Sequence, residues 1–155
     1  MRGKRLRECA SVALLLWLGC RCAHAQGVGA QIRASLEHYR VAVLQMDYDD
    51  EIAAFTEDAE LSQGKDPPLH GRAQIRAQIL AQAAFKVVAY DIGTAVTRVQ
   101  VNVAIQDGVY SQRIISPQHE SIVSRGAFEI EWSRQADGTW LISRLHTDPN
   151  ADATR

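Results

Sequence analysis

The stretch that decides the fold runs from Phe55 to Ile75 and has the sequence FTEDAELSQGKDPPLHGRAQI. It predicts the end of a short helix, then a strand over Asp58–Ser62. Gly64 and Pro67-Pro68 indicate irregular chain after that strand. A new helix is expected to begin after His70-Gly71, because glycine supplies a backbone conformation that other residues avoid. The stretch therefore joins a strand to a helix through a turn.

Two helices are predicted before this stretch. Apolar residues spaced by four and three predict a long helix over Val28–Met46, with Ile32, Leu36, Tyr39, Val43 and Met46 on one face. The acidic run Asp47–Glu51 predicts a cap for a short helix over Ile52–Phe55, since acids at a helix start accept hydrogen bonds from free N–H groups. After the decisive stretch, Arg72–Phe85 is predicted as a third helix.

From Val87 onward, valine, isoleucine and threonine dominate, which is typical of strands. Asp107-Gly108 predicts a hairpin turn between strands Val99–Ile105 and Val109–Ile115. Ala136-Asp137-Gly138 predicts another, between Ile122–Trp132 and Thr139–Leu145. Helices come first and strands follow without alternation, so the fold class expected is α+β with a mostly antiparallel sheet.

The N-terminus predicts a secretory signal peptide over residues 1–25. A basic segment, MRGKRLR, precedes an apolar run from Ala10 to Gly19 that is too short to span a membrane as a helix. Ala23-His24-Ala25 fits the cleavage pattern, which predicts a secreted or periplasmic protein. Leu18-Gly19-Cys20 resembles a lipid-attachment motif, so a lipid anchor at Cys20 is the alternative. Residues 26–148 would form one domain, and residues 149–155 a loose tail.

Composition limits the chemistry of the mature chain. Cleavage removes five of the 17 basic and one of the 18 acidic side chains, which leaves 12 against 17. No segment of the mature chain is a basic run, which argues against nucleic-acid binding. The three cysteines all lie before residue 26, so no disulfide or thiol nucleophile is expected. No metal-ligand motif appears, and Ile52 stands where a calcium-binding loop starting at Asp47 needs glycine. No cofactor and no metal are therefore expected.

The motifs FTEDAEL and HGRAQI, together with the closing DGTWLISRLHTDP, resemble the nuclear-transport-factor-2-like superfamily, which includes SnoaL-like proteins and steroid delta-isomerases. The resemblance covers almost all of the mature chain. It implies a cone-shaped curved antiparallel sheet wrapped around a long N-terminal helix, a cystatin-like arrangement, with a pocket inside the cone. The same fold serves enzymes, binding proteins and adaptors, so it does not fix an activity.

The comparison with the steroid delta-isomerases concerns three positions. Tyr39 matches the tyrosine that these enzymes use to stabilise an oxyanion. Their catalytic aspartate follows the first strand, where this chain has Leu61-Ser62-Gln63 and no carboxylate. Their second oxyanion donor is an acid on a late strand, and Glu129 falls near that region. Because a hydroxyl or amide cannot replace a carboxylate base at neutral pH, the resemblance implies a member without the isomerase base.

Two functional readings of the candidate residues remain open. In one, Tyr39, Phe55, Tyr90, Trp132 and Trp140 bind a small, largely apolar molecule, and Tyr39 orients it. In the other, an isomerase, cyclase or dehydratase uses Tyr39 as donor and His70 or His146 as base. Each residue also has a structural reading: Tyr39 as a core tyrosine, His70 as part of the turn into the third helix, and His146 as an exposed strand residue.

A third possibility is a non-catalytic protein-interaction module whose cone is filled by Trp132 or Trp140.

A homodimer is also expected. Phe128, Ile130 and Trp132 share one face of their strand, as do Trp140, Ile142 and Arg144 on the last strand, yet both faces of this region carry apolar residues. A two-fold partner would cover the outer face.

Overall fold

The computed structural model describes residues 16–149. The predicted basic segment and the last six residues of the predicted tail lie outside the described residues. The described chain folds into three helices and six strands: α1 (Leu16–Gln45), α2 (Tyr48–Ala53), β1 (Phe55–Gln63), β2 (Leu69–His70), α3 (Arg72–Ala81), β3 (Lys86–Gln100), β4 (Val103–Ile115), β5 (Ser121–Arg134) and β6 (Trp140–Asp148).

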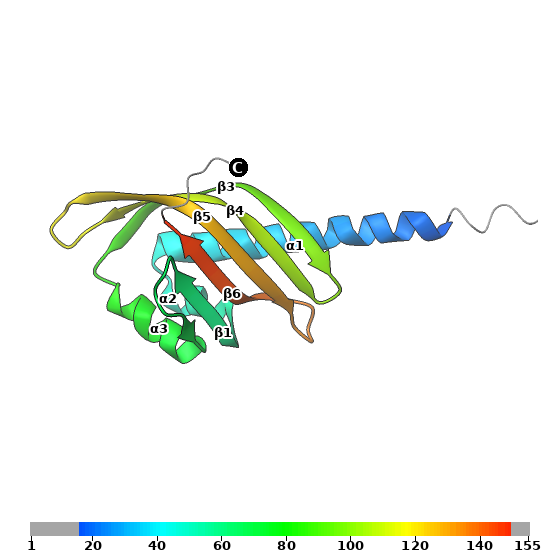
Figure 1. The fold of residues 1–155 in the computed structure, drawn as a ribbon, viewed down its shortest axis with the longest axis horizontal. Helices are drawn as coiled ribbons and strands as arrows, with labels where there is room; N and C mark the ends of the chain where they lie inside the picture. The colour runs from blue at the N-terminus through cyan, green and yellow to red at the C-terminus, as the bar shows by residue number, and fades with distance from the viewer. Residues whose placement is uncertain (1–15, 150–155) are drawn as a thin grey trace, which may run out of the picture.

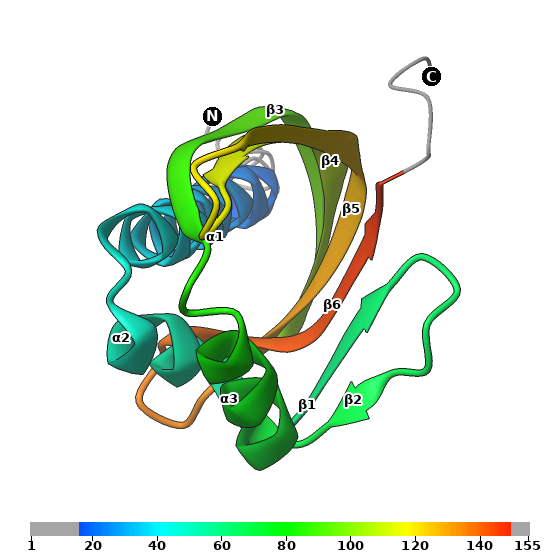
Figure 2. The same cartoon turned by 90° about the vertical axis from the view of Figure 1, so that its left-hand side faces the viewer.

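The strands form one curved sheet in the order β2-β1-β6-β5-β4-β3. Neighbouring strands are antiparallel except β1 and β6, which are parallel. Helix α1 lies along the concave side of the sheet and extends beyond it at its N-terminal end (Figure 1). Figure 2 shows the sheet curling around α1, with α2 and α3 below it. The predicted α+β class, the mostly antiparallel sheet and the cone shape are confirmed.

The turn into α3 lies at Gly71, as the sequence of residues 55–75 predicts, and hydrogen bonds to β1 hold it in place. Gly71 has φ 79° and ψ 149°, a conformation that residues with a side chain adopt only under strain. Its N–H donates to the Ala59 carbonyl at 2.8 Å. The Arg72 guanidinium donates to the Phe55 carbonyl at 3.0 Å and pairs with Glu57 at 2.7 Å. These contacts join the start of α3 to β1, which brings helix and strand together at one end of the cone.

Several predicted boundaries are shifted. The second helix begins at Tyr48, so the acidic run lies within its first turn, and Asp47 caps it by accepting from the Asp50 N–H at 3.1 Å. Phe55 is already the first residue of β1. The third helix ends at Ala81 rather than Phe85, and the two-residue strand β2 was not predicted.

The prediction of a hairpin at Asp107-Gly108 was wrong. Strand β4 continues through both residues, and the turn between β3 and β4 lies at Val101 and Asn102, where Val101 has a φ of 47°. Asp107 is paired in register with Val96 and Glu129, so neighbouring strands hold it on both sides. Pairing on two edges outweighs the local turn preference of an Asp-Gly pair. The turn at residues 136–138 is confirmed.

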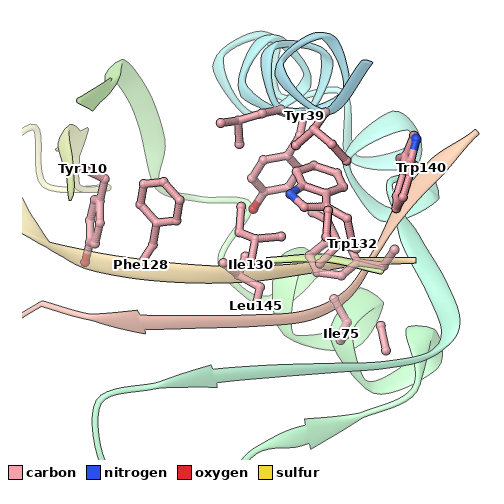
Figure 3. Packing of buried hydrophobic residues seen from close by; sticks show 14 of the residues in the cluster. Tyr39, Ile75, Tyr110, Phe128, Ile130, Trp132, Trp140 and Leu145 are labelled. Atoms are coloured by element: carbon pink, nitrogen blue, oxygen red, sulfur yellow. The ribbon is translucent and has the colours of Figure 1, made fainter. Parts of the chain in front are cut away.

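Two tryptophans fill one part of the core. Trp132 is 1% exposed, and its indole N–H donates to the buried Gln106 amide oxygen at 3.2 Å. Trp140 is 3% exposed and donates to Gln31 of α1 at the same distance. Replacing a tryptophan buried in this way by alanine costs about 3–5 kcal/mol. In Figure 3 both rings lie to one side of Tyr39, and Phe128 and Tyr110 lie to the other.

The outer face of the late strands is more polar than expected. Phe128, Ile130 and Trp132 are buried, whereas the alternate residues of β5 include Glu129 and Glu131, which pair with Arg144 at 3.3 and 3.5 Å. Arg144 does not continue the inward row of Trp140 and Ile142. The register between β5 and β6 shifts at this point, which turns Arg144 outward and Leu145 into the core.

Candidate functional site

A cavity of about 440 Å³ opens between the helices and the concave face of the sheet. Its walls come from the C-terminal half of α1, from α2 and α3, and from β1, β3, β4 and β6. Most of the side chains that line it are aromatic or aliphatic: Tyr39, Val43, Met46, Tyr48, Phe55, Leu61, Leu69, Ile79, Phe85, Val87, Tyr90, Tyr110, Ile114 and Leu145. Apolar walls with few polar groups are typical of small-molecule sites.

Tyr39 stands at the boundary between this cavity and the packed core. It is 8% exposed, and its ring packs edge to face against Phe55, with centroids 5.9 Å apart. Burial raises the pKa of Tyr39 well above its usual range, so its hydroxyl stays protonated at neutral pH. A neutral phenol in such a place donates one hydrogen bond to a bound molecule.

Glu51 is the functional candidate that the sequence analysis missed. It lies on α2 three residues after Tyr48, which places both side chains on the helix face toward the cavity. The intervening Asp49 and Asp50 are exposed. Burial raises the pKa of Glu51 to about 7. The helical spacing of Tyr48, Glu51 and the buried Ile52 is the signal that could have separated Glu51 from the other acids of its run.

Four polar side chains at this cavity have no hydrogen-bond partner among the described residues. Between residues 16 and 149, the hydroxyls of Tyr39, Tyr90 and Tyr110 and the carboxyl of Glu51 make no hydrogen bond or ion pair to one another or to any other side chain or backbone group. The Tyr48 hydroxyl differs, since it donates to the Ala83 carbonyl at 3.3 Å. All four residues line the cavity, so these groups are available to water or to a ligand.

The predicted ligand-binding residues divide into two groups. Tyr39, Phe55 and Tyr90 line the cavity. Trp132 and Trp140 do not, because both rings pack into the core and donate to Gln106 and Gln31. The sequence could not separate the groups, since an inward-facing aromatic residue fits a core and a cavity wall equally well.

The two predicted catalytic histidines are not brought together with Tyr39. His146 lies on β6 between Leu145 and Thr147, which both line the cavity, but His146 itself is not a lining residue. Its Nδ1 lies 2.8 Å from the hydroxyl of Ser62, its register partner on β1, which does line the cavity. His70 is exposed on β2, with its Nδ1 3.6 Å from Glu60. Neither histidine is among the described residues that line the cavity.

The resemblance to the isomerases places their catalytic base at Leu61-Ser62-Gln63. All three residues line the cavity, and none carries a carboxyl group. Glu129 does not serve as the second acid, because it lies on the outer face beside Arg144. Two carboxyl groups line the cavity from elsewhere, Glu51 on α2 and Asp66 after β1, and burial raises the pKa of Glu51.

A second hollow of about 560 Å³ lies between α1 and the edge strand β3. It differs from the cavity in its walls, which carry the charged residues Arg33, Glu37, Arg40 and Asp91. Arg40 is fixed there by Glu37, at 2.7 and 2.8 Å, and by the Tyr90 carbonyl at 3.1 Å. This ion pair lowers the pKa of Glu37. Because these groups satisfy one another, the aromatic cavity is the stronger candidate site.

Neither a membrane-crossing helix nor a metal cluster is found in the part of the chain that the structure describes. None of its helices is long and apolar enough to cross a bilayer. No three of its His, Cys, Asp and Glu side chains converge as metal ligands.

Comparison with known proteins now identifies the class. Residues 29–146 match the SnoaL-like domain family, and the chain belongs to it. A search of curated proteins finds no match.

Solved structures agree on the fold. A nuclear transport factor 2-like superfamily protein from Salmonella enterica subsp. enterica serovar Typhimurium str. LT2 superposes with a TM-score of 0.73 at 12% identity, covering 83% of this chain and 94% of that one. A ketosteroid isomerase-like protein from Erwinia carotovora atroseptica superposes with a TM-score of 0.64 at 20% identity, covering 79% of this chain and 96% of that one. ActVI-ORFA from Streptomyces coelicolor superposes with a TM-score of 0.66 at 17% identity, covering 78% of this chain and 96% of that one. At these identities the likeness establishes the fold alone.

Proposed function

We propose that this protein is an exported, small-molecule-binding member of the SnoaL-like family and that the aromatic cavity is its binding site. The ligand would be small and largely apolar, with one or two polar groups. Residues 1–25 would direct export and be removed after Ala25. The observation that carries the proposal is the set of four polar ends, on Tyr39, Glu51, Tyr90 and Tyr110, that lack partners within residues 16–149.

Tyr39 would orient the ligand. Its ring is fixed by Phe55 and by the core behind it, so little rotamer entropy is lost when its hydroxyl makes a hydrogen bond. Its raised pKa keeps the hydroxyl a donor. Apolar walls such as Val43, Ile79 and Val87 would supply most of the affinity by burying the rest of the molecule.

The proposal is tested by filling the cavity. Val87→Phe adds a ring to the cavity wall, whereas Val88→Phe makes the same change at the next residue of β3, which is 52% exposed. Naphthylethanol, an uncharged apolar alcohol, serves as the probe, titrated by calorimetry. We expect the wild type and Val88→Phe to bind it and Val87→Phe to lose binding at least tenfold while remaining folded. Equal binding by all three would place the probe elsewhere and overturn the proposal.

A second candidate function is enzymatic, and Glu51 is the observation that favours it. A carboxyl group with a pKa of about 7 is suited to accept a proton at neutral pH, and Tyr39 could stabilise the developing oxyanion. In this version Glu51 takes the role first assigned to His70 or His146. An enzyme of this kind would exchange the α-hydrogens of a bound ketone with deuterium from solvent, and Glu51→Gln would stop the exchange. The open cavity argues against an interaction module with a filled cone.

A further inference from the structure

The charged groups of the cavity are all of one sign. Among the described residues that line it, Glu51 and Asp66 carry carboxyl groups, and none is lysine, arginine or histidine. Arg40 lies in the neighbouring groove and is held by Glu37. A bound anion would therefore share the cavity with two carboxyl groups and no lining cation, which is electrostatically unfavourable.

The walls around this charge are aromatic. Six rings line the cavity, and they come from α1, α2, β1, β3, β4 and the segment that follows α3: Tyr39, Tyr48, Phe55, Phe85, Tyr90 and Tyr110. The face of an aromatic ring attracts a cation, and the attraction grows as water is removed. A carboxylate inside an aromatic cavity is thus complementary to a positively charged group with an apolar body.

We propose that the ligand of this cavity is an organic cation, an apolar molecule with one protonated amine or quaternary ammonium group that pairs with Glu51. This inference rests on the proposed function and specifies its ligand class. The Glu51 carboxyl has no ion-pair partner within residues 16–149, so an incoming cation displaces no internal partner. A neutral ligand would leave this carboxyl buried without a counter-ion, which costs free energy once it ionises.

Binding of a cation beside Glu51 should also release protons from that carboxyl group. The phenols of Tyr39 and Tyr90 lie close enough to Glu51 to feel its charge, and Tyr110 and Asp66 line the same cavity. Burial raises the pKa of Tyr39 and of Tyr90, so neither phenol titrates near neutrality. With a pKa of about 7, Glu51 is about half protonated at pH 7 when the cavity is empty. A cation favours the ionised form, so its binding should release about half a proton at that pH.

The experiment compares three probes of one shape and different charge: naphthylethylamine, naphthylethanol and naphthylpropanoate. Calorimetric titrations at pH 7 in buffers of different ionisation enthalpy give both the affinity and the protons released. We expect the amine to bind at least tenfold more tightly than the alcohol, and the propanoate more weakly than the alcohol. Only the amine should release protons.

Two variants distinguish the effect of the Glu51 carboxyl group on amine binding from the effect of the protein's net charge. Glu51→Gln should bring the amine down to the affinity of the alcohol and abolish proton release, while alcohol binding persists. Glu120→Gln removes a charge from an exposed loop residue and should change nothing. An amine that binds no better than the alcohol, or a preference that survives Glu51→Gln, would overturn the inference and leave the proposed function standing. Failure of the alcohol as well would contradict the proposed function itself.

Discussion

The ring of Tyr39 meets the ring of Phe55 edge to face, at 5.9 Å between centroids and 87° between planes. One residue comes from the long helix and the other from the first residue of β1, so the contact joins two elements at the edge of the cavity. Beyond it, toward Trp132 and Trp140, the interior is packed. The contact fixes the Tyr39 ring while its hydroxyl remains without a partner in the described chain.

Tyr39→Phe should therefore separate binding from stability. No hydrogen bond within residues 16–149 is lost, so we expect the free energy of unfolding to change by less than about 1 kcal/mol. Loss of the hydroxyl should weaken a ligand that accepts its hydrogen bond by about 1–2 kcal/mol, roughly five- to thirty-fold. Denaturant unfolding and calorimetric titration of naphthylethanol measure the two effects. A strongly destabilised variant would show that the hydroxyl has a structural role.

Glu51→Gln should change how stability depends on pH. Burial raises the pKa of Glu51 from 4.5 to about 7, so the folded state binds more protons than the unfolded state between these values. The stability of the wild type should fall as pH rises through this window, by about 2–3 kcal/mol from this group. The variant should match the wild type near pH 4 and exceed it at pH 8. Thermal unfolding across this range tests the expectation, and parallel curves would contradict it.

Gly126→Ala should destabilise the sheet. A Cβ atom there would meet the backbone carbonyl oxygen of Asp148 and lie 2.7 Å from the Pro149 Cα. Neither is a flexible side-chain end, so the end of β6 would have to shift, at a cost of about 1–3 kcal/mol. Gly27→Ala is the control, because nothing lies within 4 Å of its added methyl group. If both variants unfold at the same denaturant concentration, the close approach at Gly126 is not present.

Export predicts a mature chain that begins at Gln26, because Ala23-His24-Ala25 fits the cleavage pattern. Intact-mass measurement of the protein recovered from the cell envelope is the test. A chain that begins at a diacylated Cys20 would support the lipid-anchored alternative instead.

Self-association is predicted through the outer face of the late strands. The face is more polar than the sequence suggested, since Arg144 pairs with Glu129 and Glu131 within the chain. Exposed aliphatic residues remain on its neighbouring strands, including Val96 and Val103. A symmetric pair would cover them. Light scattering at micromolar concentration should give twice the chain mass, and the mass of a single chain would refute the dimer.

The sequence predicted the fold well because its strongest signals act locally and agree with one another. The apolar stripe of α1, the glycine before Arg72 and the turn at residues 136–138 each lie where expected. The error at Asp107-Gly108 arose where pairing with Val96 and Glu129 overrode a local preference. Long-range pairing of this kind leaves little trace in a single sequence.

The site was only partly predictable. The helical stripe and the family resemblance led to Tyr39, but Glu51 appeared as one capping acid among several. Only the packing of α2 against the cone distinguishes its buried carboxyl from the exposed Asp49 and Asp50. The side of the sheet on which His70 and His146 lie depends on a strand register that the sequence does not specify.

Native mass spectrometry of the protein purified from its own cell envelope shows whether the cavity binds a small molecule. We expect a population whose mass exceeds that of the mature chain by one small molecule. This extra mass should be present in Val88→Phe and absent from Val87→Phe, which fills the cavity. A retained molecule that persists unchanged in Val87→Phe would show that the cavity is not the binding site.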